Sequence, residues 1–338
     1  MKRVVIIALA LLMLVGCAPQ KTRYTAVNID CFDTVTQIIA YTNTENDFKR
    51  LEALVFDELR HYHQLFDAYN SYEGVNNIKT INDNAGKAPV EVDKDLFDLL
   101  KTAKQLYKTT NGKTNVALGS VLYLWHEHRE SSLNGVETSI PETSKLVEKS
   151  HHTDIEKLVL DEKNSTVFLS DPKMRIDVGA VAKGFAADRI SALVRSQGYD
   201  SVAISLGGNV ITVGKRADGS DWSIGIQDPF DKNGTVLSVR LTDKSLVTSG
   251  DYERVYYHEG KKYHHIIDPD TLMPAVYFSS VSIISSDSAL ADALSTALFC
   301  MPLEDGVALV EGLDSVEALW ITPDGKQYRS SGFDEVVK

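Results

Sequence analysis

The spacing of apolar residues in the first third of the chain predicts a strand pair followed by two amphipathic helices. Residues 27–41 alternate between apolar and polar side chains, as a strand or hairpin does. Apolar side chains then recur every three or four residues over 46–66 and again over 93–109, which is the spacing of a helix with one buried face. The second helix is expected to stop at Asn111-Gly112.

The rest of the chain mixes both periodicities without strict alternation. We expect a strand over 167–176, a turn at Gly179, and a helix that runs to Gln197 and stops at Gly198. Short strands separated by glycine-containing turns are predicted over 201–265, then a strand over 280–284 and a helix over 289–300. This mixture favours an α+β fold over a doubly wound parallel sheet. We assign residues 27–330 to a single large domain with mixed sheets and packed helices.

The N-terminus has the pattern of an export signal. Lys2 and Arg3 precede an apolar run over 4–15 that is shorter than the roughly 20 residues of a membrane span. The run ends in Leu14-Val15-Gly16-Cys17, which resembles a bacterial lipobox. We therefore predict a lipoprotein signal peptide over 1–16, lipidation of Cys17, a polar tether over 17–26, and an exported protein anchored to the outer face of the cell membrane or a periplasmic leaflet. The alternative is an ordinary cleaved signal with a chance cysteine.

The charge of the chain limits its partners. Removal of residues 1–16 deletes two positive charges and no acids, so the net charge moves from −12 to −14. An acidic protein is a poor ligand for nucleic acid. To bind an anionic substrate it would need a local source of positive charge, such as a metal ion or a helix N-terminus. Beyond Cys17 only Cys31 and Cys300 remain, and they form neither a disulfide framework nor a zinc-binding spacing.

The segment 175–188 places an acid, Asp177, before the glycine turn and a cation, Lys183, in the first turn of the helix after it. The helix dipole disfavours a cation at that position, and a bound phosphate would reverse this. A surface lysine paired with Asp177 or Asp188 is an equal alternative. Gly179 and Gly184 have no following Ser or Thr, so this is not a Walker loop.

Asp292 and Thr296 lie four residues apart and share one face of an otherwise apolar helix. A buried carboxylate needs a partner, and Mg²⁺ with oxygen ligands is one solution. The alternative is an aspartate that caps or hydrogen-bonds near the helix start.

Of the histidine pairs considered as site candidates, only one points to chemistry. His264 and His265 lie on a predicted strand over 262–267 that ends at Asp268-Pro269, so their side chains should face opposite sides. For His126 with His128, and for His151 with His152, we favour surface histidines over metal ligands. The Ser205-to-Asn209 segment, with Gly207 and Gly208, predicts a hairpin with a close backbone approach.

Together these motifs resemble the family of FAD:protein FMN transferases (ApbE-type flavin transferases), in order over about 27–330. The matching segments are 66–69, 116–125, 177–188, 205–209, 248–254, 264–269 and 290–296. The resemblance implies an ApbE-like fold with a T-fold-like core, and transfer of FMN from FAD to a Ser or Thr hydroxyl of an acceptor flavoprotein with release of AMP. It also implies one or two Mg²⁺ ions as cofactor and FAD as substrate, while the acidic charge argues against a nucleic acid partner.

The resemblance further assigns roles to individual residues. His265 would be the base that takes the proton of the acceptor hydroxyl, with His264 pointing away. The metal ligands would be the Ala180 carbonyl, the Asp292 carboxylate and the Thr296 hydroxyl. The residues that contact FAD would be Tyr69, Thr114, Asn115, Asp177, Lys183 and Ile267.

The chain departs from the family pattern in two segments. Lys113-Thr114-Asn115 stands where many members have Phe-Asp-Pro, and Phe32-Asp33-Thr34 stands where Met-Gly-Thr is usual. Two rival functions stay open at this point. Water could replace the acceptor, which would give an FAD pyrophosphatase that forms FMN and AMP, or the chain could be a non-catalytic FAD-binding lipoprotein.

Overall fold

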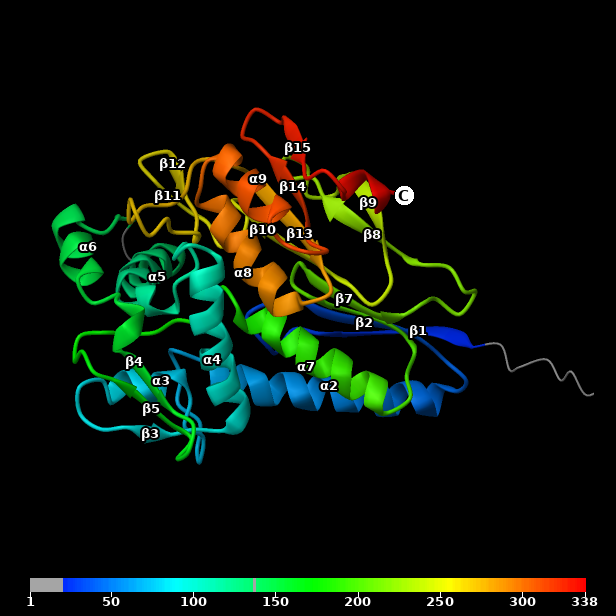
Figure 1. Cartoon of the computed structure of the whole chain (residues 1–338), viewed down its shortest axis with the longest axis horizontal. Helices are drawn as coiled ribbons and strands as arrows, with labels where there is room; N and C mark the ends of the chain where they lie inside the picture. Colours follow the sequence, from blue (N-terminus) through cyan, green and yellow to red (C-terminus); the bar gives the residue numbers. More distant parts are fainter. Residues whose placement is uncertain (1–20, 136–137) are drawn as a thin grey trace, which may run out of the picture.

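An eight-stranded sheet runs through the part of the chain that the computed structural model describes, residues 21–135 and 138–338 (Figure 1). All neighbouring strands pair antiparallel. In spatial order the strands are β1 (Thr22–Asn28), β2 (Thr36–Thr42), β6 (Ser201–Leu206), β7 (Asn209–Gly214), β10 (Ser245–Gly250), β13 (Ser280–Ser285), β14 (Glu317–Ile321) and β15 (Gln327–Arg329). This sheet with its covering helices confirms the predicted α+β class.

Three helices, α2 (Glu45–Phe66), α7 (Ala182–Ser196) and α8 (Ser288–Phe299), pack on one face of this sheet. In Figure 1 they lie in front of the strands. Helix α2 buries its predicted apolar face, and it begins where the Thr44 side chain accepts a hydrogen bond from the Asp47 N–H. Helix α9 (Leu303–Glu311) follows α8 and packs near β14.

A smaller two-stranded sheet covers part of the other face. It consists of β8 (Trp222–Gln227) and β9 (Thr235–Leu241), and the 3₁₀ turn η3 (Phe333–Glu335) lies beside it. Side chains of β13 alternate between the two sides: Ile283 packs with the helices, whereas Ile284 packs with β8, β9 and the buried Phe333. The folded domain thus reaches beyond residue 330, where the sequence analysis ended it.

A long insertion between β2 and β6 builds the other side of the molecule. It contains the helices α3 (Ile78–Asp83), α4 (Lys94–Thr109), α5 (Gly119–Leu133) and α6 (Thr143–Ser150), the short turns η1 (Val116–Leu118) and η2 (Ile155–Lys157), and the sheet of β3 (Val90–Glu91), β5 (Thr166–Leu169) and β4 (Leu158–Asp161). A hairpin of β11 (Tyr256–His258) and β12 (Lys261–Tyr263) packs against α5. Trp125 and Tyr263 stack there, with ring centroids 5.9 Å apart.

The structure corrects several predicted boundaries. The strand expected over 167–176 ends at Leu169, because Asp171 forms a turn in which its side chain accepts the Lys173 N–H and Pro172 supplies no donor. Strand β12 ends at Tyr263, so His264 and His265 follow the strand instead of lying on it. Residues 22–26, assigned to the tether, form most of β1 and pair with β2.

The predicted signal peptide and Cys17 lie outside the described residues. Among the described helices, none has both the length and the apolar character needed to cross a membrane.

Candidate active site

One cavity of about 370 Å³ collects residues from both sides of the molecule. Its walls come from the loop after α2, the turn before η1, the turn into α7, the loop after β12, and one face of α8. All of the residues predicted to form the site line this cavity: Tyr69, Thr114, Asn115, Asp177, Ala180, Lys183, His265, Ile267, Asp292 and Thr296. Their individual roles stay predictions.

Asp292 projects from the second turn of α8 and is only 3% exposed. Its Oδ2 accepts a hydrogen bond of 2.8 Å from the Gly184 N–H in the first turn of α7. The alternative role for Asp292 was to cap the start of its own helix. Asp287 forms that cap instead, by accepting a hydrogen bond from the Leu290 N–H. Burial raises the pKa of the Asp292 carboxyl, and the nearby Lys183 opposes this.

A hard cation would fit the oxygen groups at this wall of the cavity. Asp292, Thr296 and Ala180 all line it and offer a carboxylate, a hydroxyl and a backbone carbonyl, and a cation would stabilise the ionised form of the buried carboxylate. The only cluster of three or more acidic, His or Cys side chains with metal-ligand spacing in the described part of the chain lies elsewhere, at the mostly exposed His61, Asp93 and Asp95.

Lys183 faces the cavity from the first turn of α7. Within the described residues it does not form the ion pair considered for it. Asp177 accepts hydrogen bonds from the Gly179 N–H and the Tyr69 hydroxyl, and Asp188 accepts from the N-terminus of α8. A cation at a helix N-terminus, with its neighbouring carboxylates bonded elsewhere, is suited to an anionic ligand.

His265 lies in the loop after β12, with its Nδ1 3.1 Å from the Glu253 carbonyl oxygen. Since a carbonyl can only accept, Nδ1 carries the proton and Nε2 keeps its lone pair. Burial and the neighbouring charges of Arg254 and His264 hold the pKa of His265 well below 6.5. This imidazole is neutral near pH 7 and can accept a proton.

His264 is buried, borders the same cavity, and does not lie on the predicted strand. Its Nε2 donates to the Ala275 carbonyl oxygen at 2.9 Å, its Nδ1 accepts from the Ile266 N–H, and its ring meets Phe299 edge-on. Both ring nitrogens are therefore used within the fold, and the pKa of His264 is lowered by burial.

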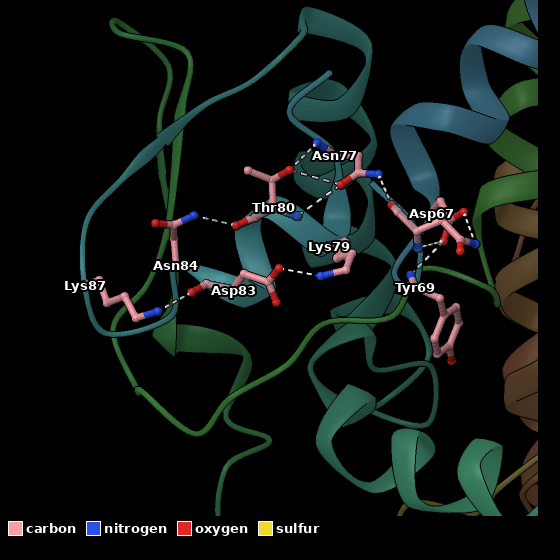
Figure 2. A network of polar contacts seen from close by, with 9 residues as sticks. Asp67, Tyr69, Asn77, Lys79, Thr80, Asp83, Asn84 and Lys87 are labelled. Atoms are coloured by element: carbon pink, nitrogen blue, oxygen red, sulfur yellow. Dashed lines mark hydrogen bonds and ion pairs between the residues drawn. The ribbon is translucent and has the colours of Figure 1, made fainter. Parts of the chain in front are cut away.

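Tyr69 stands on a rigid loop at the mouth of the cavity. The Asp67 carboxylate accepts hydrogen bonds from the N–H groups of Tyr69 and Asn70 and from the Tyr72 hydroxyl. Although burial raises the pKa of Asp67, these bonds bring it below its ordinary value. The Asn77 side chain, which caps α3, ties the same loop down by donating to the Asn70 carbonyl (Figure 2). Figure 2 shows the Tyr69 ring projecting away from this network.

Among the lining residues to which the sequence assigned no role, His126 and Arg254 stand out. His126, interpreted as a surface residue, is half-buried and stacks on Tyr69 with ring centroids 4.0 Å apart and planes 24° apart. Arg254 also lines the cavity, and its guanidinium donates to the Phe32 carbonyl oxygen at 3.2 Å. Arg254, Phe32 and Asp33 all adopt left-handed φ values of 47°, 58° and 51°. Such strained backbone is typical of functional sites, but only the fold reveals it.

Thr114 and Asn115 line the cavity with side chains that are already bonded elsewhere. The Thr114 hydroxyl donates to the Ala293 carbonyl of α8 at 2.6 Å, and Asn115 caps η1 and donates to the Thr153 carbonyl. Their contact with a nucleotide would therefore fall to the backbone. Lys113 bridges Asp268 and Asp270, which joins this segment to the loop of His265.

The Ser205-to-Asn209 segment forms the predicted tight turn, between β6 and β7. Gly207 has a φ of 55°, and a Cβ there would overlap the side chain of Thr34. Glycine thus lets Thr34 reach the cavity edge, where both residues lie.

The chain resembles known proteins along most of its length. The sequence model of the ApbE family matches residues 32–320. The chain is 34% identical over 278 residues to an FAD:protein FMN transferase of Klebsiella pneumoniae, covering 80% of this chain and 82% of that protein. It is 37% identical over 278 residues to an FAD:protein FMN transferase of Treponema pallidum, covering 77% and 75%.

Solved structures agree as well. The crystal structure of the ApbE protein of Thermotoga maritima superposes with a TM-score of 0.84 at 28% identity, covering 94% of this chain and all of that one. The flavin transferase ApbE of Vibrio cholerae superposes with a TM-score of 0.78 at 25% identity, covering 93% of this chain and 100% of that one. This chain therefore belongs to the ApbE family.

Proposed function

We propose that this chain is an FAD:protein FMN transferase that moves FMN from FAD onto a Ser or Thr hydroxyl of an acceptor flavoprotein and releases AMP. The observation that carries the proposal is the cavity in which a neutral histidine, a lysine at a helix N-terminus and a buried aspartate meet. Membership of the ApbE family supports the same reaction.

The reaction needs one bond made and one broken. The acceptor oxygen forms a bond to the phosphorus on the FMN side of the FAD diphosphate, and the bond from that phosphorus to the bridging oxygen breaks. AMP leaves with the bridging oxygen, and the hydroxyl proton passes to Nε2 of His265. The Glu253 carbonyl keeps the ring in the tautomer that this transfer requires.

Binding and orientation of FAD are assigned to the other cavity residues. Lys183 offers a cation to the diphosphate at the N-terminus of α7. Asp177 and Tyr69, joined by a hydrogen bond of 3.2 Å, would orient the nucleotide together with the loop at Ile267. Asp292, Thr296 and the Ala180 carbonyl would hold one or two Mg²⁺ ions, which when bound offset the negative charge of the diphosphate.

We also propose that the protein is exported and anchored at the membrane through a lipid on Cys17. The support is the sequence pattern of residues 1–17.

Mass spectrometry of a Thr-containing flavoprotein acceptor tests the transferase reaction. Residues 21–338 are incubated with the acceptor, FAD and Mg²⁺, and we expect the acceptor to gain the mass of one FMN. The gain should disappear with EDTA, with Asp292→Ala and with His265→Ala. It should persist with His152→Ala, a control whose ring is bonded to Asp171 and does not line the cavity.

Other products would support the rival functions. Free FMN and AMP beside an unmodified acceptor, repeated with several acceptors, would replace the transferase with a pyrophosphatase. FAD that stays intact and bound in equimolar amount would indicate a flavin carrier. For His265→Ala we expect lost turnover with retained FAD binding, and unchanged turnover would remove His265 from its role.

A further inference from the structure

Helices α7 and α8 cross at a point where no side chain fits. A Cβ on Gly184 of α7 would overlap the Ser288 carbonyl oxygen of α8 and would lie 2.7 Å from the Cβ of Asp292. This close approach lets the Gly184 N–H reach the Asp292 carboxylate at 2.8 Å. The carboxylate predicted to bind metal is thus held by the first turn of the neighbouring helix.

Asp188 makes the reciprocal contact. It lies one turn after Gly184 on α7, and its two carboxylate oxygens accept hydrogen bonds of 2.9 Å from the N–H groups of Ser288 and Ala289. These donors belong to the first turn of α8, whose N–H groups have no partner within their own helix. Each helix therefore supplies a carboxylate to the N-terminus of the other. Asp188 lies four residues after Gly184 on α7, and Asp292 lies four residues after Ser288 on α8.

The reciprocal contact connects the two halves of the candidate metal site. Ala180 precedes α7, whereas Asp292 and Thr296 lie on α8. Asp188 does not line the cavity itself, so it acts on the site through its bonds to α8 and through its charge near Asp292. Two hydrogen bonds across the crossing oppose both sliding and rotation of α8 along α7. Burial raises the pKa of the Asp188 carboxyl to about 7, and the two N–H donors oppose this.

We propose that Asp188 is a positioning residue for the metal site: by bonding the first turn of α8 it sets where Asp292 and Thr296 stand relative to Ala180. This inference rests on the proposed function, because it assumes that these oxygens bind a divalent cation. Replacement of a residue that orients metal ligands without contacting the metal commonly weakens metal affinity by about 10- to 100-fold.

Asp287 provides a matched control. It also accepts a hydrogen bond at the N-terminus of α8, from the Leu290 N–H at 2.8 Å, but it is exposed and belongs to α8 itself. Asp287→Asn removes a charge near the same helix end without cutting the link to α7. A role in helix stability alone would make the two variants similar.

The experiment measures Mn²⁺ binding to residues 21–338 by electron paramagnetic resonance, with and without FAD, and the rise in Tm caused by Mg²⁺. All variants are compared well below their Tm. We expect Asp188→Asn to weaken Mn²⁺ binding by about tenfold or more and to reduce the Tm rise. Asp287→Asn should stay within about twofold of the native protein.

If Asp188→Asn does not fold, the measurement is made on a second variant, Asp188→Ser. In Asp188→Asn the new amide would turn its NH₂ group toward an N–H donor of α8, whereas Asp188→Ser offers a small acceptor there. A folded Asp188 variant with Mn²⁺ affinity within twofold of native would overturn the positioning role. Equal weakening by Asp287→Asn would do the same. If the native protein itself bound no Mn²⁺ in either condition, the metal assignment would fail, and this inference with it.

Discussion

At the residue scale, the chemistry depends on one nitrogen atom. The Glu253 carbonyl accepts the Nδ1 proton of His265, which leaves Nε2 as the ring position that can accept another. Burial, Arg254 and His264 all disfavour the imidazolium, so the pKa lies well below 6.5. The adjacent His264 is a poor substitute, because both of its nitrogens are bonded within the core.

The lowered pKa of His265 predicts the pH dependence of FMN transfer. The neutral ring is the active form, so acid inactivates the enzyme only when pH falls through the folded pKa of His265. We expect kcat at saturating Mg²⁺ and FAD to change little between about pH 8 and the ordinary histidine pKa of about 6.5, and to fall in more acidic solution. An acid limb with its midpoint at or above 6.5 would contradict a neutral base whose pKa is lowered by the fold. Residual activity of His265→Gln should lack this limb.

At the scale of elements, the site depends on how closely α7 and α8 approach. Gly184 allows this contact, and Asp292 and Asp188 hold it from either side. The same crossing brings the first turn of α7, with Lys183, to the face of α8 that carries Thr296.

Alanine substitutions at two helical glycines should therefore have opposite effects on stability. Gly184→Ala places a methyl against backbone atoms of α8, and we expect it to lower the free energy of unfolding by about 1–3 kcal/mol or more. Gly306 in α9 has its nearest neighbour at an ordinary 3.5 Å, so Gly306→Ala should raise the free energy of unfolding by up to about 1 kcal/mol. Urea unfolding measures both. A neutral Gly184→Ala would contradict the close crossing.

At the scale of the whole molecule, α2 and α7 connect the cavity to the end of the domain where the described chain begins. The last residue of α2, Phe66, lines the cavity, whereas near its start the Asp47 carbonyl accepts from the Tyr199 hydroxyl. The intervening helix spans about 28 Å at 1.5 Å per residue. Lys21 pairs with Asp200, next to Tyr199. In Figure 1, β1 accordingly starts at the right, and α5 and β11 lie at the left.

This separation predicts that anchoring and catalysis are independent. With Cys17→Ser we expect the chain to move from the membrane fraction to the soluble fraction, because the predicted lipid is its only proposed anchor. Residues 21–338 should transfer FMN with a kcat within about twofold of the lipidated protein, since the anchor end lies a helix length from the cavity. Membrane retention of Cys17→Ser would refute lipidation as the anchor.

The sequence predicted much of the fold because periodicity reports burial directly. The predicted helices correspond to α2, α4, α7 and α8, with ends within a few residues. Helix α5 was missed because its apolar residues do not repeat at helical spacing: it is covered on several sides and contributes His126 to the cavity. The supposed strand over 167–176 shows the opposite error: the prediction carried one strand through the polar residues 170–173, where the chain turns at Asp171.

The order of short motifs by itself determined the family, and most of the residues predicted for the site lie within those motifs, because each motif carries its own backbone conformation and chemistry. Only the tertiary structure decided what each side chain does with its polar atoms. In the folded chain the Thr114 hydroxyl donates to α8, and the Glu253 carbonyl sets the tautomer of His265. His126 stacks on Tyr69, and Asp188 of α7 accepts a hydrogen bond from the first turn of α8. The physical reason is that hydrogen bonds and ring contacts depend on distances of a few ångströms between residues far apart in sequence, which periodicity and spacing do not encode.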